Sequence, residues 1–168
     1  AIKKNVAGIN VLNKVGLAAG FDKNSRVFHS IGTFGFGYVI VGTVTLGAKE
    51  GNPKPRFRRL FKHQALVNSM GFPNDGVVKV IQRIQSRRAK LKDLAVVVSI
   101  SGVTVNEIAE CLEIVQPYCD AVELNLSSPN TKGIKVFHEK ENFNELLQEL
   151  NRLRTKPLWI KLPSYGQA

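Results

Sequence analysis

The stretch AVELNLSSPN, residues 121–130, joins an apolar run to a polar one. Its first part, residues 121–126, is mostly apolar, which is typical of a buried β-strand. The residues that follow are Ser127, Ser128, Pro129 and Asn130. Ligands of α/β proteins bind at the carboxyl ends of strands. The stretch therefore predicts a strand whose end carries hydrogen-bonding groups into a binding site.

A second stretch, VGLAAG at residues 15–20, has the same design. Its apolar part leads through small residues into Phe21, Asp22, Lys23 and Asn24. Because parallel strands end at the same edge of a sheet, we expect the two stretches to meet in one site.

Apolar runs rich in β-branched residues recur at residues 15–19, 38–44, 94–100, 121–126 and 157–162. Their nearly continuous apolar character predicts parallel strands that are buried on both faces. Helical periodicity lies between them, at residues 77–84, 105–115 and 143–153, and more weakly at 25–34. Strands that alternate with helices predict an α/β fold made of βαβ units.

Two helix starts and one hairpin are also predicted. Thr104 and Asn142 are each followed three residues later by a glutamate, which predicts a helix N-terminus at each. Residues 50–76 interrupt the alternation, and within them residues 56–60 and 64–68 predict a hairpin. Long excursions after a barrel strand are usually functional.

The length of the chain limits the architecture. Its 168 residues allow a single domain with a real core, and no linker divides residues 1–168. A (β/α)8 barrel needs about 250 residues and eight strands, whereas this chain has about five strand-like runs. We therefore expect the N-terminal part of a TIM barrel, incomplete as it stands. An open sheet has an edge that recruits other chains, so an oligomer or a part of a larger chain is expected.

The charge of the chain is strongly positive. Lys and Arg total 24 against 13 Asp and Glu, a formal net charge of +11. Such an excess favours phosphate, carboxylate, acidic lipid or nucleic acid as partners, or it is simply a solvated basic surface. A nucleic-acid-binding module is the weaker interpretation, because the interleaved aromatics of such modules are missing, and we expect no nucleic-acid partner.

Cys111 and Cys119 have neither metal-ligand spacing nor a disulfide framework. His29, His63 and His138 show no metal spacing either, and we expect no metal site. No run reaches the roughly 18 apolar residues of a membrane helix, and no signal peptide is evident. These features predict a protein of the reducing cytoplasm.

Four motifs follow one another: LAAGFDK at residues 17–23, EGNPKPR at 50–56, NSMGF at 68–72 and NLSSPN at 125–130. In this order they resemble dihydroorotate dehydrogenase, and the resemblance covers most of the chain. It implies a TIM barrel with the cofactor FMN. The implied function is FMN-dependent oxidation of dihydroorotate to orotate in de novo pyrimidine biosynthesis. The alternative left open is a half-barrel fragment without catalytic activity.

Ser128 is the candidate catalytic base. The implied reaction gives a hydride to the flavin and a proton to a base, and the family places serine or cysteine here. A serine is a weak base and needs a relay or a water molecule to take up the proton. Serine resembles the branch that uses a quinone as electron acceptor, which implies peripheral contact with a membrane. In the other interpretation Ser127 and Ser128 only cap a turn.

The resemblance assigns substrate contacts to several residues of these motifs. Amide side chains carry both donors and an acceptor, which matches the alternating groups of a pyrimidine. Local turn chemistry is the alternative role for the asparagines. The residues that would hold dihydroorotate or orotate are Lys23, Asn68, Met70, Gly71, Phe72, Asn125 and Asn130.

The resemblance also assigns residues to the flavin, whose flat ring can approach the backbone closely at small residues. Lys161 lies in an apolar run, so we expect a buried lysine that faces the pyrimidine end of reduced flavin; a lysine that snorkels from an edge strand is the alternative. Ser99 stands where the family has asparagine. The implied cofactor-binding residues are Ala18, Ala19, Gly20, Lys23, Thr43, Ser99, Asn125 and Lys161.

Two further expectations concern Glu123 and the FMN phosphate. Glu123 is the only acidic residue in its predicted strand, and a structural hydrogen-bonding role is expected for it. The chain has no Gly-rich phosphate loop, and the family binds the FMN phosphate in its last barrel strands. We therefore expect this chain alone to bind FMN poorly.

Overall fold

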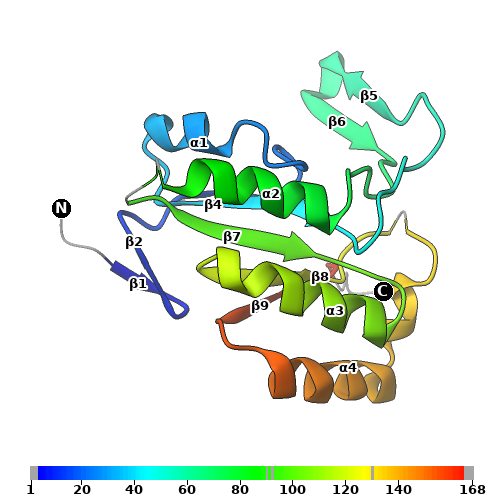
Figure 1. Ribbon diagram of the computed structural model, residues 1–168. Coiled ribbons are helices and arrows are strands. Elements are labelled where there is room, and N and C mark those ends of the chain that lie inside the picture. The colour runs from blue at the N-terminus through cyan, green and yellow to red at the C-terminus, as the bar shows by residue number, and fades with distance from the viewer. Residues whose placement is uncertain (1–3, 90, 92, 130, 165–168) are drawn as a thin grey trace.

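The computed structural model describes residues 4–89, 91, 93–129 and 131–164. Its main feature is a five-stranded parallel sheet in the order β3–β4–β7–β8–β9. The sheet is curled like part of a barrel wall (Figure 1), which confirms the expected incomplete TIM barrel. Its strands are β3 (Gly16–Leu17), β4 (Tyr38–Val44), β7 (Ala95–Ile100), β8 (Ala121–Asn125) and β9 (Leu158–Lys161).

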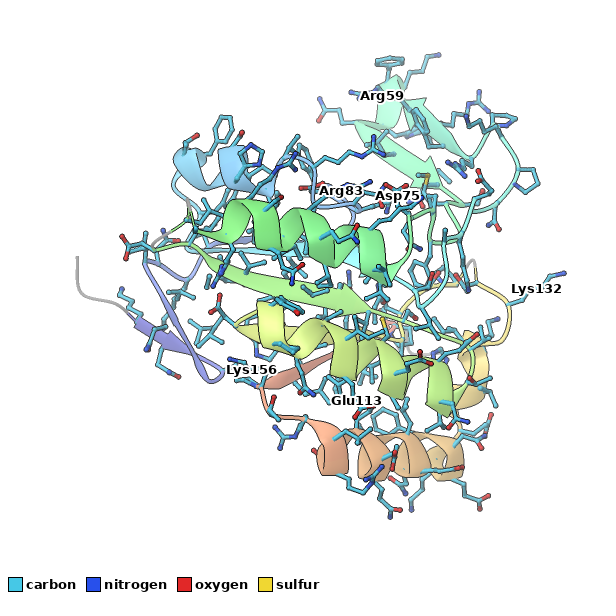
Figure 2. The ribbon with its side chains drawn as sticks, in the orientation of Figure 1. Arg59, Asp75, Arg83, Glu113, Lys132 and Lys156 are labelled. Atoms are coloured by element: carbon cyan, nitrogen blue, oxygen red, sulfur yellow. The ribbon has the colours of Figure 1, made fainter. Side chains whose placement is uncertain are left out.

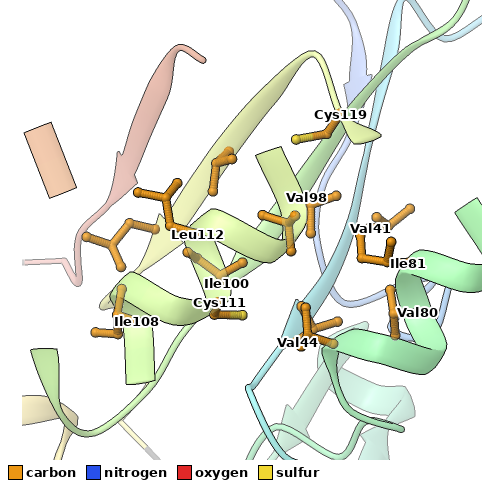
Figure 3. Packing of buried hydrophobic residues seen from close by; sticks show 14 of the residues in the cluster. Val41, Val44, Val80, Ile81, Val98, Ile100, Ile108, Cys111, Leu112 and Cys119 are labelled. Atoms are coloured by element: carbon orange, nitrogen blue, oxygen red, sulfur yellow. The ribbon is translucent and has the colours of Figure 1, made fainter. Parts of the chain in front are cut away.

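Helices alternate with these strands along the chain and enclose the main core between themselves and one face of the sheet. Val98 and Ile100 of β7 pack there with Leu112 of the third helix (Figure 3). The α-helices are α1 (Phe28–Ile31), α2 (Val77–Arg88), α3 (Val105–Val115) and α4 (Lys140–Leu153). Short 3-10 segments are η1 (Gly32–Phe34), η3 (Gln116–Tyr118) and η4 (Ile134–His138).

The opposite face of the sheet carries a second, smaller core. Val97 and Ala121 of the sheet pack there with Ile9 of an N-terminal hairpin. Trp159 Nε1 donates a hydrogen bond to Ala7 O at 3.0 Å, which ties the hairpin to β9. This hairpin was not predicted, because strands of three residues are too short to show a period. Its strands are β1 (Lys4–Val6) and β2 (Ile9–Val11).

The two outer strands are less buried than their apolar sequences predicted. Residues 15–19 were expected to form a buried strand, but β3 has two residues and Val15 is 64% exposed. Lys161 was expected to be buried and is exposed. The reason is that β9 has only β8 as a strand neighbour among the described residues, so the edge-strand alternative holds for Lys161.

One predicted helix start is confirmed and the other is wrong. Thr104 forms a capping box with Glu107, whose backbone N donates to Thr104 Oγ1 at 3.2 Å. Helix α4 begins at Lys140, before Asn142. The side chain of Asn142 instead donates to Val136 O of η4 at 3.1 Å, so it ties the helix to the preceding segment rather than starting the helix.

The predicted hairpin within residues 50–76 is confirmed. It pairs β5 (Phe57–Leu60) with β6 (Ala65–Asn68) in antiparallel fashion across η2 (Phe61–His63). At the base of the excursion Asn74 forms a β-bridge with Lys49, and its side chain donates to Thr45 Oγ1 at 2.9 Å and to Phe72 O at 2.8 Å. These bonds hold the excursion at the carboxyl end of β4.

The edges of the sheet remain open among the described residues, where β3 and β9 each pair on one side. That the chain forms one domain, and that it is an oligomer or part of a larger chain, stay predictions. In the part of the chain that the structure describes, no helix has the length and apolar character needed to span a bilayer.

Candidate active site

A pocket of ≈ 580 Å³ opens at the carboxyl edge of the sheet, where β8 and β9 end. Ligand pockets usually measure about 300–1,000 Å³. The two stretches that opened the sequence analysis meet here, as expected, because Lys23 and Ser128 line the same pocket. The predicted residues on its wall are Gly20, Lys23, Asn68, Met70, Gly71, Phe72, Asn125, Ser128 and Lys161. The wall also includes Phe57, Leu66, Ser127 and Pro129, which were not predicted as site residues.

Asn125 anchors a buried polar cluster beneath the pocket. Its Nδ2 donates to Thr43 Oγ1 at 2.8 Å, and Thr43 Oγ1 lies 2.9 Å from Ser99 Oγ. All three side chains are buried, so Thr43 and Ser99 lie behind Asn125 and do not line the pocket wall. Gly42 permits the close approach of β4 and β7, because a Cβ there would lie 2.5 Å from Ser99 O.

The turn after β8 presents Ser128. Asn125 Oδ1 accepts hydrogen bonds from Ser127 N at 3.0 Å and from Ser127 Oγ at 2.7 Å. Ser127 therefore caps the turn, while Ser128 lines the pocket and its Oγ lies 3.0 Å from Thr131 Oγ1. Thr131 was not predicted as a site residue, although a hydroxyl three residues after Ser128 is a readable signal in the sequence. A second hydroxyl at this distance can relay a proton.

Two cations, Lys23 and Lys161, line the pocket, and a third, Arg56, acts on Lys23 through its charge. Burial, and then the positive charges of Arg56 and Lys161, lower the pKa of Lys23 from its ordinary value. Neither Lys23 nor Lys161 forms an ion pair among the described residues. Arg56, which the sequence analysis did not predict, donates to the backbone oxygens of Glu50 and Asn52. Uncompensated positive charge in a partly buried pocket favours an anionic ligand.

Lys23 is held between two anchored neighbours. The buried carboxylate of Asp22 accepts backbone hydrogen bonds at the start of α1, the shortest from Phe28 N at 2.7 Å. Asn24 Oδ1 accepts from Asp75 N at 2.9 Å, and Arg83 donates to Asn24 O at 3.1 Å. The loop that carries Lys23 is thereby joined to the segment that follows the pocket residue Phe72.

An ion-pair cluster reinforces this junction. Asp75 Oδ2 pairs with Arg83 at 2.6 Å and with Arg26 at 3.1 Å (Figure 2 labels Asp75 and Arg83). Burial alone would raise the pKa of Asp75, but the hydrogen bonds and charges of Arg83 and Arg26 outweigh it and lower that pKa. A carboxylate with a lowered folded pKa stabilises the fold above its unfolded pKa, and this stabilisation is lost as the pH falls through the folded value.

We expect Asp75→Asn to lower the free energy of unfolding near neutral pH by about 0.5–1 kcal/mol, a modest amount because the pair is partly exposed and screened. The difference from the parent should shrink in acid, below the ordinary pKa of 3.8. Urea unfolding at neutral and acid pH measures both, with Glu145→Gln on the exposed face of α4 as control. A difference that persists undiminished in acid would contradict the assignment.

The segment from Asn68 to Phe72 has an unusual backbone. Phe72 is buried and has φ +54°, a left-handed conformation that is rare for a bulky residue. Such strain persists only where the surroundings hold it, and it is often found at functional sites. Gly71 has φ +68°, and a Cβ there would lie 2.5 Å from Asn52 Oδ1. The close packing of Asn52 against Gly71 helps to hold this segment beside the pocket.

Other predicted residues are not on the pocket wall. Ala18 is exposed and Ala19 is half-buried on the segment beside it. Asn130 lies outside the described residues. Glu123 is buried in β8, but its Oε1 has no hydrogen-bond partner among the described residues, so the expected hydrogen-bonding role is not seen for that atom.

The two cysteines are buried free thiols. Burial raises the pKa of Cys111 to about 12, with a further contribution from the charge of Glu110. Burial likewise raises the pKa of Cys119 to about 12, and Asp120 adds to the shift. Because the thiolate is the reactive form, neither cysteine is a nucleophile near neutral pH.

Comparison with known proteins gives one consistent match. A sequence model of the family "Dihydroorotate dehydrogenase" matches residues 1–167. A protein of Marinomonas sp. (strain MWYL1) named dihydroorotate dehydrogenase (quinone) is 42% identical over 159 residues, which are 90% of this chain and 45% of that protein. A protein of the same name from Saccharophagus degradans is 38% identical over 157 residues, covering 90% of this chain and 46% of that protein.

Solved structures agree with this match. A crystal structure of DHODH from Eimeria tenella in complex with ferulenol has a TM-score of 0.84 and 30% sequence identity. The similarity covers 95% of this chain and 51% of that one. The chain thus spans about half the length of the relatives that it matches.

Proposed function

Since this chain belongs to the dihydroorotate dehydrogenase family, we propose that it carries part of a site for the FMN-dependent oxidation of dihydroorotate to orotate, a step of pyrimidine biosynthesis. The observation that carries this proposal is the convergence of Lys23, Asn68 and Ser128 on one pocket. These residues belong to separate motifs, and folding brings all three to the carboxyl edge of the sheet, where ligands of parallel barrels bind.

Ser128 is the proposed base. The oxidation removes a proton and a hydride from adjacent carbons of dihydroorotate and leaves a carbon–carbon double bond in orotate. Ser128 Oγ takes the proton from carbon, and its own proton passes on toward Thr131 Oγ1, 3.0 Å away. A serine hydroxyl works as a base only with such an outlet for its proton. The hydrogen bonds of Ser127 to Asn125 keep the turn that presents Ser128 in place.

The proposed cofactor is FMN, which when bound would accept the hydride. The residues present fit its flavin ring in three respects. Gly20 leaves one side of the pocket free of a side chain, and the nearest atom to a Cβ built there is Lys23 Nζ at 3.7 Å. Lys23 and Lys161 line the pocket without an ion-pair partner among the described residues, and a reduced flavin is electron-rich. The side chain of Asn125 donates a hydrogen bond to Thr43, which in turn contacts Ser99, and so gives the pocket a fixed polar floor.

The substrate is proposed to bind through amide and ammonium groups. The side chains of Asn68 and Asn125 offer the donors and acceptors that a pyrimidine ring requires. The lowered pKa of Lys23 reflects burial and the charges of Arg56 and Lys161, and a bound carboxylate would offset both. Dihydroorotate and orotate carry one carboxylate each, so the charge of the pocket matches theirs.

A quinone is the proposed acceptor of the electrons. The relatives from Marinomonas and Saccharophagus carry this acceptor in their names. The pocket wall continues outward onto the apolar side chains of Phe57 and Leu66, which are 68% and 62% exposed. Apolar side chains beside a polar pocket suit a quinone, because its ring is lipid-soluble and must come close to the flavin. A protein of the cytoplasm that contacts a membrane at its periphery would have access to such a quinone.

Anaerobic mixing of the FMN-loaded protein with dihydroorotate tests the proposal. The protein is this chain, or a longer protein that contains it. Loss of the visible absorbance of oxidised flavin, with formation of orotate, is the expected result. If the flavin stays oxidised although orotate binds to the pocket, the proposed oxidation is wrong and the chain only binds the ligand. Failure to bind either FMN or orotate would favour the fragment without catalytic activity.

We expect Asn68→Ala to weaken orotate binding by about 1–2 kcal/mol, roughly 5–30-fold, because polar groups of the bound ligand lose a partner. FMN content should stay unchanged, since Asn68 is the last residue of β6 in the hairpin and does not belong to the five-stranded sheet. Equilibrium titration with orotate measures the effect, and Asn144→Ala on the exposed face of α4 is the control. Equal orotate affinity in the variant and the parent would leave Asn68 with a turn role only.

A further inference from the structure

A second cavity lies beside the active-site pocket, at the same carboxyl edge of the sheet. Its volume is ≈ 740 Å³, against ≈ 580 Å³ for the pocket. One wall comes from the excursion after β4, and the other comes from the loop after β8. The lining residues are Lys49, Asn52, Gly71, Pro129, Thr131, Lys132, Gly133 and Lys135. The proposed function uses neither this cavity nor its lysines.

The charge of the cavity has one sign. Its lining includes three lysines and no Asp or Glu. Residues 51–74 and 124–138, which supply most of the two walls, contain no acidic residue at all. None of the three lysines forms an ion pair among the described residues. Glu50 is exposed and does not line the cavity. Uncompensated positive charge around a concave surface favours an anionic ligand.

The wall after β4 is fixed by hydrogen bonds. Lys49 N donates to Asn74 O and Asn74 N donates to Lys49 O, both at 2.9 Å. Asn52 Nδ2 donates to Ser69 O at 2.9 Å. Lys49 is half-buried, so one cation of the cavity stands on a held backbone and is partly shielded from water. A shielded charge attracts an anion more strongly than a fully solvated one.

The loop after β8 places the other two cations at the rim. Lys132 and Lys135 are exposed, and Lys132 projects from its loop (Figure 2). Ile134, which lies between them in the chain, is fully buried. A Cβ at Gly133 would lie 3.1 Å from Val103, so the loop packs closely on the body of the protein. The backbone is therefore anchored, whereas the long lysine side chains can turn toward a bound ligand.

The cavity shares a wall with the active-site pocket. Gly71 and Pro129 line both. Thr131 lines the cavity and Ser128 lines the pocket, and their hydroxyl oxygens are 3.0 Å apart. A ligand in the cavity would thus be separated from a ligand in the pocket by a single layer of residues.

We propose that this cavity binds a small anion that carries phosphate, and that the bound anion weakens orotate binding in the neighbouring pocket. Three lysines call for more than the single charge of a carboxylate. The oxygens of a phosphate group can accept hydrogen bonds from several ammonium groups and from the hydroxyl of Thr131 together. The anion and orotate have charges of the same sign, so each lowers the affinity for the other. This second effect rests on the proposed function, whereas the anion site itself does not.

Calorimetric titration of the 168-residue chain with inorganic pyrophosphate tests the site. One equivalent should bind, and the affinity should fall as salt is raised. Lys49→Gln should weaken binding about ten-fold, because a charge-assisted hydrogen bond on a partly buried wall is lost. Lys132→Gln and Lys135→Gln should each weaken it about three-fold, since exposed ion pairs contribute less.

Lys14→Gln is the matched control. It removes the same charge from an exposed residue just before β3, at the amino edge of the sheet and therefore remote from the cavity. Pyrophosphate should bind to this variant as to the parent. Circular dichroism shows whether each variant keeps the fold.

Titration with orotate at rising pyrophosphate tests the coupling. The apparent Kd of orotate should rise about five-fold and then stay constant, because a separate site saturates. In Lys49→Gln the same rise should need about ten-fold more pyrophosphate. An orotate Kd that rises in proportion to pyrophosphate without limit would mean that both ligands compete for one pocket.

Three further outcomes would overturn the proposal. The first is pyrophosphate binding that Lys23→Gln abolishes and the three cavity variants leave intact, which would place the anion in the active-site pocket. The second is equal weakening by Lys14→Gln and Lys49→Gln, which would mean attraction to the net charge alone. The third is an orotate affinity that saturating pyrophosphate leaves unchanged, which would remove the coupling. If orotate does not bind at all, the proposed function fails, and the pyrophosphate titration still decides whether the anion site exists.

Discussion

Replacing Ser128 with alanine should slow the reduction of bound FMN by dihydroorotate about 10²–10⁴-fold, the usual contribution of a positioned general base. The hydroxyl is half-buried at the pocket wall and 3.0 Å from Thr131 Oγ1. Its loss therefore removes the group that accepts the proton and also the first step by which a proton passes toward Thr131. Single-turnover absorbance of the flavin measures the rate. FMN content and orotate affinity should stay near those of the parent, because alanine leaves the turn bonds of Ser127 intact.

Three variants sharpen this test. Ser128→Cys should restore part of the rate and change its pH dependence, since a thiol has an ordinary pKa of about 8.5. Thr131→Val should slow the same step while keeping Ser128 in place, whereas Ser86→Ala on the exposed face of α2 should change nothing. Rapid single-turnover reduction in Ser128→Ala would exclude Ser128 as the base and leave it with a role in the turn.

Replacing Asn125 with alanine should lower the free energy of unfolding by about 2–4 kcal/mol, through unsatisfied buried groups and a small cavity. The amide of Asn125 donates to Thr43 Oγ1 and accepts from Ser127 N and Ser127 Oγ. Alanine leaves Ser127 N and Ser127 Oγ without this acceptor and leaves Thr43 Oγ1 with its contact to Ser99 Oγ alone. The loosened turn should also weaken orotate binding and slow flavin reduction, so stability and function fall together in this variant.

Urea unfolding measures the first effect and orotate titration the second. Asn106→Ala on the exposed face of α3 is the matched control and should change stability little. Ser99→Ala is an informative companion, because Ser99 Oγ contacts Thr43 but does not line the pocket. It should lower stability and leave orotate affinity near that of the parent. A stable Asn125→Ala protein with parental orotate affinity would remove Asn125 from both roles.

The sequence by itself determined the central strands and the hairpin of the excursion. Residues 95–100 and 121–125 are buried throughout, as their unbroken apolar character predicted. A strand covered on both faces needs apolar residues at nearly every position, and the residues of the strand itself are enough to show this pattern. The outer strands failed the same prediction because burial depends on neighbours. Val15 directly precedes β3 and Lys161 ends β9, and each of these strands has one partner among the described residues.

Sequence motifs also identified most of the pocket wall, but only tertiary structure decided how those residues are arranged. The bond that joins Asn125 to Thr43 spans 82 positions of the chain. The pKa of Lys23 is lowered by burial and by Arg56 and Lys161, which are distant from it in sequence. Strand and turn patterns are set by interactions over a few residues, whereas distances, burial and electrostatic fields arise only when remote segments pack. For that physical reason the effect of Arg56 on Lys23 and the hydrogen bonds that join Thr43, Ser99 and Asn125 became visible only in the folded chain.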